Sequence, residues 1–329
     1  MTRATGIGSW PGTDVREAIV TTRDLLLDAD GLGLPYLPET PARGPGADLI
    51  GRGAGLLVDL HVDLQPSGWR FVDRPGKDAA RTAALIRQDL DELAEAYDGY
   101  TGPLKVQVAG PWTLAASVEL NRGERSVSDP GATRDLLASL SEGISRYAAD
   151  ARRLIPGADL VIQLDEPSLP AVLQGLLPNA SGYGRVRAVD PQVVGTGLRA
   201  LVEAQSAPVV IHCCHPSAPI PLLRNTAAAA LALDVTDATP ARWESLAATI
   251  ESGIGLYAGA LPTDGTASVE RGKRLVLDAF ETVGLAAEHL DALTLTPACG
   301  LASSTVAGAR HTQRTAIDLA RDLTEEATR

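Results

Sequence analysis

The sequence has no long apolar run and little positive charge. No stretch approaches the roughly 20 consecutive apolar residues that a membrane-spanning helix requires, so we expect no membrane association. The formal net charge is −12 and the arginines are scattered along the chain. A basic surface for a phosphate backbone is therefore missing, and we expect no nucleic-acid partner.

Cysteine is also scarce, and its placement argues against a disulfide framework. The chain has three cysteines, an odd number, and Cys213 and Cys214 are adjacent. Metal or thiol chemistry in a reducing compartment fits this pattern better. The sequence begins Met1-Thr-Arg-Ala-Thr-Gly, without the charged segment, apolar segment and cleavage site of a secretory signal, so we expect a cytoplasmic location.

Aromatic residues make up only 4% of the chain, so the core must come from Ala, Val and Leu, which suits the layered interior of a barrel. Short apolar runs alternate with longer amphipathic stretches, the pattern of repeated βα units around a parallel sheet. The second run is the weakest strand because Pro35 interrupts it. We predict an α/β fold, a (β/α)8 TIM barrel, in a single domain over residues 1–329. The predicted strands are 4–8, 32–37, 105–110, 160–165, 208–214, 230–235, 254–261 and 293–299, and the predicted helices are 15–27, 79–96, 132–154, 191–204, 240–252, 268–283 and 305–326.

A segment over residues 41–76, rich in Gly, Pro and Asp, interrupts this rhythm between the second and third strands. We interpret it as an elaborated excursion with a hairpin over residues 56–64 that covers the barrel mouth. Linkers and repeats that would indicate a second domain are missing from the sequence.

Polar and reactive residues follow the predicted strands where each strand ends. In a barrel those carboxyl ends meet at one face, where active sites are built, so we expect the scattered positions to form one pocket. They are Ser9, Glu39, Gly110-Pro111-Trp112, Asp165-Glu166-Pro167, His212-Cys213-Cys214, Asp234 and Cys299.

Three of these residues predict a zinc site. Strand side chains alternate, so His212 and Cys214 point to one side and Cys213 to the other. Cys299 ends the eighth strand, and one His with two Cys suits a catalytic zinc ion that keeps a replaceable position. Asp234, better placed than Asp237, is the candidate fourth ligand, although a carboxylate there could equally cap the next turn.

Two alternatives stay open on spacing alone. Small buried cysteines often only pack, and His212 is then a hydrogen-bonded core residue. A thiol nucleophile paired with His212 or His215 is the second alternative.

Five ordered motifs resemble one family over nearly the whole chain: Ile7-Gly-Ser-Trp-Pro, Gly110-Pro-Trp-Thr, Ile162-Gln-Leu-Asp-Glu-Pro, His212-x-Cys214 and Pro297-Ala-Cys-Gly-Leu. The sequence resembles the catalytic, carboxyl-terminal domain of cobalamin-independent methionine synthase and the related short single-domain proteins.

The resemblance implies a TIM-barrel methyltransferase in which Zn²⁺ binds the sulfur of homocysteine and presents it as a thiolate, so that methionine is formed. His212, Cys214 and Cys299 match the zinc ligands, and Asp234 is expected to replace the family's glutamate ligand. Ile7 and Ser9 match the segment that holds the amino-acid substrate. Asp165 matches the acid that grips its ammonium group, and Glu39 matches a second such acid. Asp165 and Cys214 are therefore the expected catalytic residues. Trp112 is either a stacking surface for a planar methyl donor or packing at the barrel mouth.

Two departures bear on the methyl donor. The chain is about half as long as the two-barrel folate-dependent enzymes, and Ala260 stands where the family has a catalytic histidine. Without that proton donor, a methylated corrinoid, free or on a partner protein, or another methyl compound is an alternative to 5-methyltetrahydrofolate. Other readings are a non-catalytic zinc- or thiol-binding barrel and a lyase like uroporphyrinogen decarboxylase, which the lack of an Arg cluster disfavours.

Overall fold

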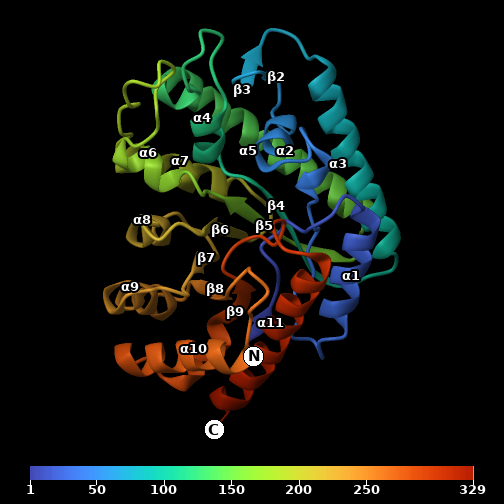
Figure 1. Cartoon of the computed structure of the whole chain (residues 1–329), viewed down its shortest axis with the longest axis vertical. Helices are drawn as coiled ribbons and strands as arrows, with labels where there is room; N and C mark the ends of the chain where they lie inside the picture. The colour runs from blue at the N-terminus through green and yellow to red at the C-terminus, as the bar shows by residue number, and fades with distance from the viewer. Residues whose placement is uncertain (329) are drawn as a thin grey trace.

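A computed structural model describes residues 1–328, and in it a curled parallel sheet lies in the middle of the molecule with helices around it (Figure 1). The strands lie in the order β1-β9-β8-β7-β6-β5-β4, and neighbouring strands pair in parallel. Their bounds are β1 (Arg3–Ala4), β4 (Gly102–Ala109), β5 (Ala158–Asp165), β6 (Val209–Cys213), β7 (Ala230–Asp234), β8 (Gly255–Leu261) and β9 (Leu293–Pro297).

The predicted second strand closes the sheet between the edge strands β1 and β4. Ala4 bridges Gly33 and Tyr36 bridges Lys105, both in parallel. The Lys105 amide donates to the carbonyl of Pro35 at 2.8 Å. The predicted barrel is thus confirmed, with the second strand reduced to isolated bridges, because Pro35 has a carbonyl to offer but no N–H.

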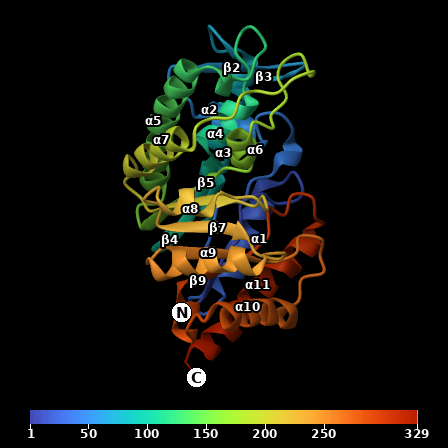
Figure 2. The ribbon, with the colours of Figure 1, turned by 90° about the vertical axis from the view of Figure 1, so that its left-hand side faces the viewer.

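Long helices pack outside the sheet, and Figure 2 shows α8 and α9 along one side of it. They are α1 (Val15–Leu27), α3 (Lys77–Ala96), α5 (Pro130–Leu154), α7 (Pro191–Glu203), α9 (Pro240–Glu251), α10 (Val269–Val283) and α11 (Val306–Ala327). The side chain of Asp190 caps α7 and that of Thr239 caps α9, each before a proline at the first turn. Shorter helices are α2 (Leu49–Gly55), α4 (Pro111–Ser117), α6 (Leu169–Gln174) and α8 (Ile220–Arg224), with 3-10 turns η1 (Pro41–Arg43), η2 (Ser126–Ser128) and η3 (Ala287–Ala292).

The segment between residues 41 and 76 contains η1, α2 and an antiparallel hairpin of β2 (His61–Gln65) and β3 (Gly68–Val72). The hairpin predicted over residues 56–64 was wrong in position, because Leu56 instead caps the carboxyl end of α2. The turn follows Gln65, and Gly68 takes a φ of +133° that favours glycine. The hairpin pairs with Glu119, beyond α4, at the end of the molecule opposite both termini (Figure 1).

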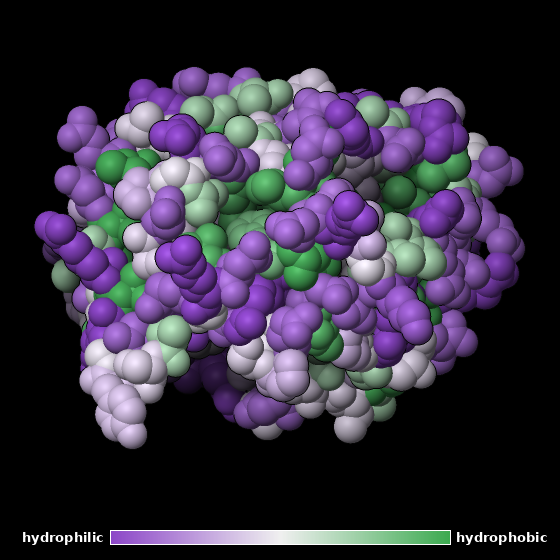
Figure 3. Space-filling model, turned by 90° about the horizontal axis from the view of Figure 1, so that it is seen from above, coloured by the Kyte–Doolittle hydropathy of each residue, from purple (hydrophilic) through white to green (hydrophobic). Residues whose placement is uncertain are grey.

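Successive side chains of the central strands alternate between the outer face of the sheet, under the helices, and its inner face. Val209, Ile211 and Cys213 of β6 pack in the main core under the helices, whereas Val210 belongs to a smaller cluster inside the barrel. His212 therefore shares the inner face with Val210. On the outside, hydrophilic side chains cover much of the face seen from above, with apolar side chains gathered near its middle (Figure 3). Within residues 1–328, no helix is long and apolar enough to cross a membrane.

Candidate metal and substrate site

The structure brings His212, Cys214 and Cys299 together at the carboxyl ends of β6 and β9. Their ligand atoms all lie within 4.8 Å of one another. The two sulfurs are 3.3 Å apart, too far for a disulfide bond. Cys214 and Cys299 are 85 positions apart in the sequence, and with His212 they form one group of three metal-type ligands.

The His212 ring is oriented so that one nitrogen is left without a partner. Nδ1 lies 2.8 Å from Oδ1 of Asp165, its neighbour in the register of β5 and β6. Nε2 is buried and has no hydrogen-bond partner among the described residues. A bare imidazole nitrogen beside two sulfurs is a donor set that fits zinc, and a carboxylate on the other ring nitrogen is the usual support for such a ligand.

The thiols of Cys214 and Cys299 share one hydrogen bond. Their mutual hydrogen bond lowers the pKa of Cys299 to about 6 and raises that of Cys214. Burial of Cys299 opposes this lowering. One sulfur is therefore poised to lose its proton near neutral pH, and the thiolate is the form that binds metals.

Asp165 is held from a second side by residues that the sequence analysis missed. Nε2 of Gln163 donates to Asp165 Oδ1 and to the Ile7 carbonyl, both at 2.7 Å. Nζ of Lys105 donates to Gln163 Oε1 at 2.7 Å and to the same carbonyl at 2.9 Å. Burial lowers the pKa of Lys105 to about 7, although the charges of Asp165 and Glu39 oppose the shift. Lys105 and Gln163 could have been found from the sequence, because they are polar residues at inward-facing positions of two predicted strands.

The segment around Ile7 and Ser9 lies beside both the acids and the metal-type group. Ser9 bridges Glu39 in parallel, and its carbonyl accepts from the Leu301 amide at 2.9 Å, just after Cys299. The predicted substrate-holding segment is thus positioned next to the predicted ligands, and its role in binding stays a prediction.

Glu39 is buried and already has a cationic partner from the excursion. Nε of Arg52, in α2, donates to Glu39 Oε1 at 2.9 Å. Arg52 also pairs with the fully buried Asp89, which accepts a two-bond fork from Arg43 at 2.7 and 2.8 Å. Burial raises the pKa of Glu39, and Arg52 counteracts it. A substrate ammonium group would have to share this acid with Arg52.

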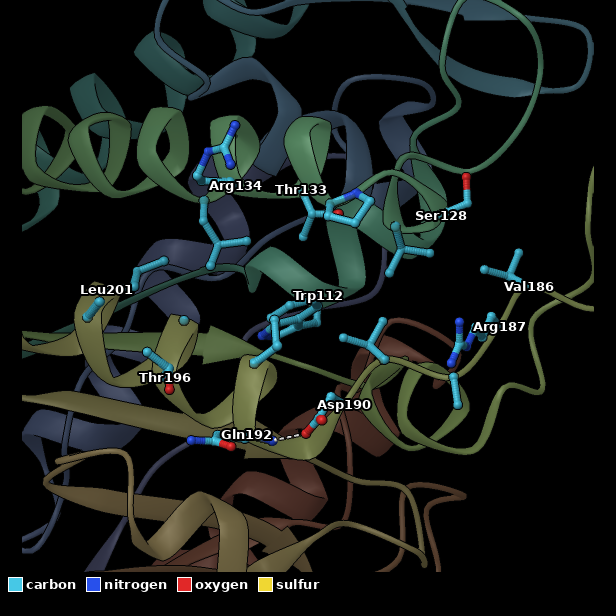
Figure 4. Close-up of a pocket in the computed structure, with 18 of the residues that line it drawn as sticks. Trp112, Ser128, Thr133, Arg134, Val186, Arg187, Asp190, Gln192, Thr196 and Leu201 are labelled. Carbon is cyan, nitrogen blue, oxygen red and sulfur yellow. Dashed lines mark hydrogen bonds between the residues drawn. The ribbon is translucent and has the colours of Figure 1, made fainter.

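Trp112 is buried in the structure, and its role as a stacking surface or as packing stays a prediction. Only 1% of its surface is exposed, and it forms part of a groove of about 1190 Å³ between α5 and α7 (Figure 4). Leu137 and Gly197 lie on the two helices that line this groove. The groove includes none of the three metal-type ligands.

Glu166 is fully buried and caps the helix that carries Trp112. Its carboxylate accepts hydrogen bonds from the Trp112 amide at 2.9 Å and from the amide and hydroxyl of Thr113, both at 2.8 Å. Burial raises the pKa of Glu166 to about 7 against these hydrogen bonds. Gly110 permits the close approach, because a Cβ there would lie 2.4 Å from the Glu166 carboxyl carbon. Glu166 thus joins the loops after β4 and β5.

Replacing Glu166 with glutamine is expected to lower the free energy of unfolding by about 1–3 kcal/mol at pH 8, because an amide NH₂ would face backbone donors that then lose their acceptor. Urea unfolding measures the change. The matched control is Glu124→Gln, a partly exposed side chain that also accepts from backbone amides and should cost less than the Glu166 variant. Equal losses in the two variants would contradict the capping role.

Comparison with known proteins identifies the family. Residues 1–322 match the family described as the catalytic domain of cobalamin-independent synthase. The chain belongs to that family.

One solved structure extends the comparison to the fold. A B12-independent methionine synthase from Shewanella sp. W3-18-1, in complex with selenomethionine, aligns with a TM-score of 0.65 at 12% identity, over 99% of this chain and 98% of that one. A putative sugar phosphate isomerase/epimerase from Anabaena variabilis aligns with a TM-score of 0.46 at 11% identity, over 100% of this chain and 99% of that one. A search of curated proteins found no significant match.

The structure places Asp234 outside the group of metal-type ligands. Its Oδ1 accepts from the Thr236 amide at 2.9 Å and from the Thr236 hydroxyl at 2.6 Å. Asp234 is therefore a turn cap, the alternative left open by its position, and the expectation of a fourth ligand is not supported. Asp237 is exposed, as is His215, whose ring accepts from the Ser217 amide.

Ala260, which the resemblance places at the family's catalytic histidine, lies in β8 and is 4% exposed. A methyl side chain cannot donate a proton, so no proton can come from this side chain.

Proposed function

We propose that this protein is a zinc-dependent methyltransferase that methylates the sulfur of homocysteine and so forms methionine. The observation that carries the proposal is the convergence of His212 with the sulfurs of Cys214 and Cys299, together with a His212 Nε2 that has no hydrogen-bond partner among the described residues. Membership in the cobalamin-independent synthase family supports methyl transfer as the reaction class.

The residues of the site have two proposed roles, metal binding and substrate binding. His212, Cys214 and Cys299 would hold the ion and leave a fourth position open. A zinc ion bound there would keep a substrate thiol deprotonated near neutral pH. Asp165 fixes the His212 ring, and its negative charge attracts the substrate ammonium group.

We propose a methylated corrinoid, free or on a partner protein, as the donor. In the transfer, the carbon–sulfur bond forms as the carbon–cobalt bond breaks, and its electron pair stays on cobalt, so no proton is needed. Transfer from 5-methyltetrahydrofolate breaks a carbon–nitrogen bond, and the nitrogen that leaves must be protonated. Ala260 cannot supply that proton.

Zinc-loaded protein is expected to form methionine from homocysteine with methylcobalamin as the donor. With 5-methyltetrahydrofolate we expect a rate lower by about 100-fold or more, the usual contribution of a general acid. Mass spectrometry of methionine formed over time is the measurement. Faster turnover with 5-methyltetrahydrofolate would contradict the donor assignment.

Ala260 also favours a second candidate, a zinc-dependent thiol-binding protein without turnover. Homocysteine binding that requires zinc, together with no methionine formed from either donor, would support this candidate and overturn the methyltransferase proposal.

A further inference from the structure

Lys105 is a buried cation inside the barrel for which the proposed reaction has no direct use. It lies in β4 with none of its surface exposed. Its Nζ donates to the Ile7 carbonyl and to Gln163 Oε1, and lies 5.2 Å from the centre of the Tyr36 ring. A buried lysine is costly unless its charge is compensated, so its presence here calls for a role.

Lys105 Nζ, which donates, and the Ile7 carbonyl, which accepts, fix the orientation of the Gln163 amide. Lys105 Nζ donates to Gln163 Oε1, so the amide oxygen faces the lysine. The Ile7 carbonyl can only accept, so the amide nitrogen must face that carbonyl. Both constraints agree, and they direct Gln163 Nε2 to Asp165 Oδ1 at 2.7 Å.

The chain of hydrogen bonds continues from Asp165 to His212. Asp165 Oδ1 receives the Gln163 amide on one side and lies 2.8 Å from His212 Nδ1 on the other. An ionised carboxylate oxygen accepts, so the imidazole hydrogen is on Nδ1 and Nε2 carries a lone pair. Nε2 is the ring nitrogen left without a hydrogen-bond partner among the described residues, and His212 belongs to the metal-type group with Cys214 and Cys299.

We propose that Lys105 is a positioning residue: through Gln163 it orients the Asp165 carboxylate and so selects the His212 tautomer that can bind a metal ion. The link to metal binding rests on the proposed function. The link to the tautomer does not, because it can be measured in metal-free protein.

The first test is the His212 tautomer in metal-free, ¹⁵N-labelled protein. The ¹⁵N shifts of the ring nitrogens identify which one carries hydrogen, and the His212→Gln variant assigns the signals among the five histidines. We expect wild type to show hydrogen on Nδ1 alone. Lys105→Met, of similar length but without a donor, should also populate the Nε2–H form, because Gln163 loses the partner that anchors its oxygen.

The second test is the zinc affinity of a double-mutant cycle, measured by competition with a chromophoric chelator. Lys105→Met and Gln163→Met are each expected to weaken zinc binding by about 10–100-fold, the usual effect of an outer-shell partner. If Lys105 acts through Gln163, the double variant should be no weaker than the worse single variant. Additive losses would show two independent effects and overturn the proposal.

Gln313→Leu is the matched control, since Gln313 is a buried amide in α11 with no side-chain hydrogen-bond partner among the described residues. It should leave the tautomer and the zinc affinity unchanged. An unchanged tautomer in Lys105→Met would overturn the proposal whatever the metal result, and Gln163→Met repeats this test if Lys105→Met does not fold. A changed tautomer in a protein that binds no zinc would contradict the proposed function and leave the positioning role intact.

Discussion

Alanine in place of Cys214 or Cys299 is expected to reduce bound zinc from near one ion per chain to near none. Each sulfur is one of three ligand atoms that lie within 4.8 Å of one another. The loss should exceed the roughly 10–100-fold that removal of an outer-shell partner costs, because a direct bond to the metal is lost. Elemental analysis of protein purified with zinc gives the stoichiometry, and methionine formation should fall with it.

Cys213→Ala is the matched control for both variants. Cys213 is adjacent to Cys214 but faces outward into the core, where it is fully buried. It should keep its zinc and lose only some stability, since a small cavity replaces the sulfur. Zinc retained at full stoichiometry in Cys214→Ala and Cys299→Ala would contradict the metal site.

Asn in place of Asp165 is expected to remove most of the preference for a thiol that carries an amino group. In the wild type, homocysteine should bind about 10–100-fold more tightly than 4-mercaptobutanoate, which lacks only the ammonium group. A hydrogen bond to a charged group contributes about 1.5–3 kcal/mol. The Asp165→Asn variant keeps the shape but not the charge, so the ratio should approach one. Competitive binding of the two thiols to zinc-loaded protein measures it.

Asp159→Asn provides a control on the same strand. Asp159 lies at the other end of β5, where it is exposed. Its substitution should leave the ratio between the two thiols unchanged. Saturating zinc is needed in both variants. Asp165 also supports His212, so its loss should lower the zinc affinity. An unchanged ratio in Asp165→Asn would assign the ammonium group to another acid, with Glu39 the first to test.

Local sequence patterns were sufficient for most of the barrel and for the metal-type group. Apolar runs predicted the strands because both faces of a parallel sheet are covered, and the Asp190-Pro191 and Thr239-Pro240 pairs predicted where two helices begin. Alternation separated His212 and Cys214 from Cys213, since it depends only on the pleat of one strand. The ordered motifs then indicated the family to which the chain belongs.

The hydrogen-bond partners of the polar residues depended on the tertiary structure. Asp234 caps a turn at Thr236, Glu39 pairs with Arg52 from α2, and the position of the β2–β3 hairpin follows where α2 ends. Lys105 and Gln163 are single polar residues in two different strands, and the sequence does not indicate that their side chains are in contact.

Sequence by itself determined the barrel, the inward and outward faces of its strands and the three candidate ligands, because these follow from periodicities of a few residues. Tertiary structure alone decided which polar groups satisfy one another. A hydrogen bond forms over about 3 Å, and neither the distance between two side chains nor the rival donors around them can be derived from residue spacing when the partners come from different strands.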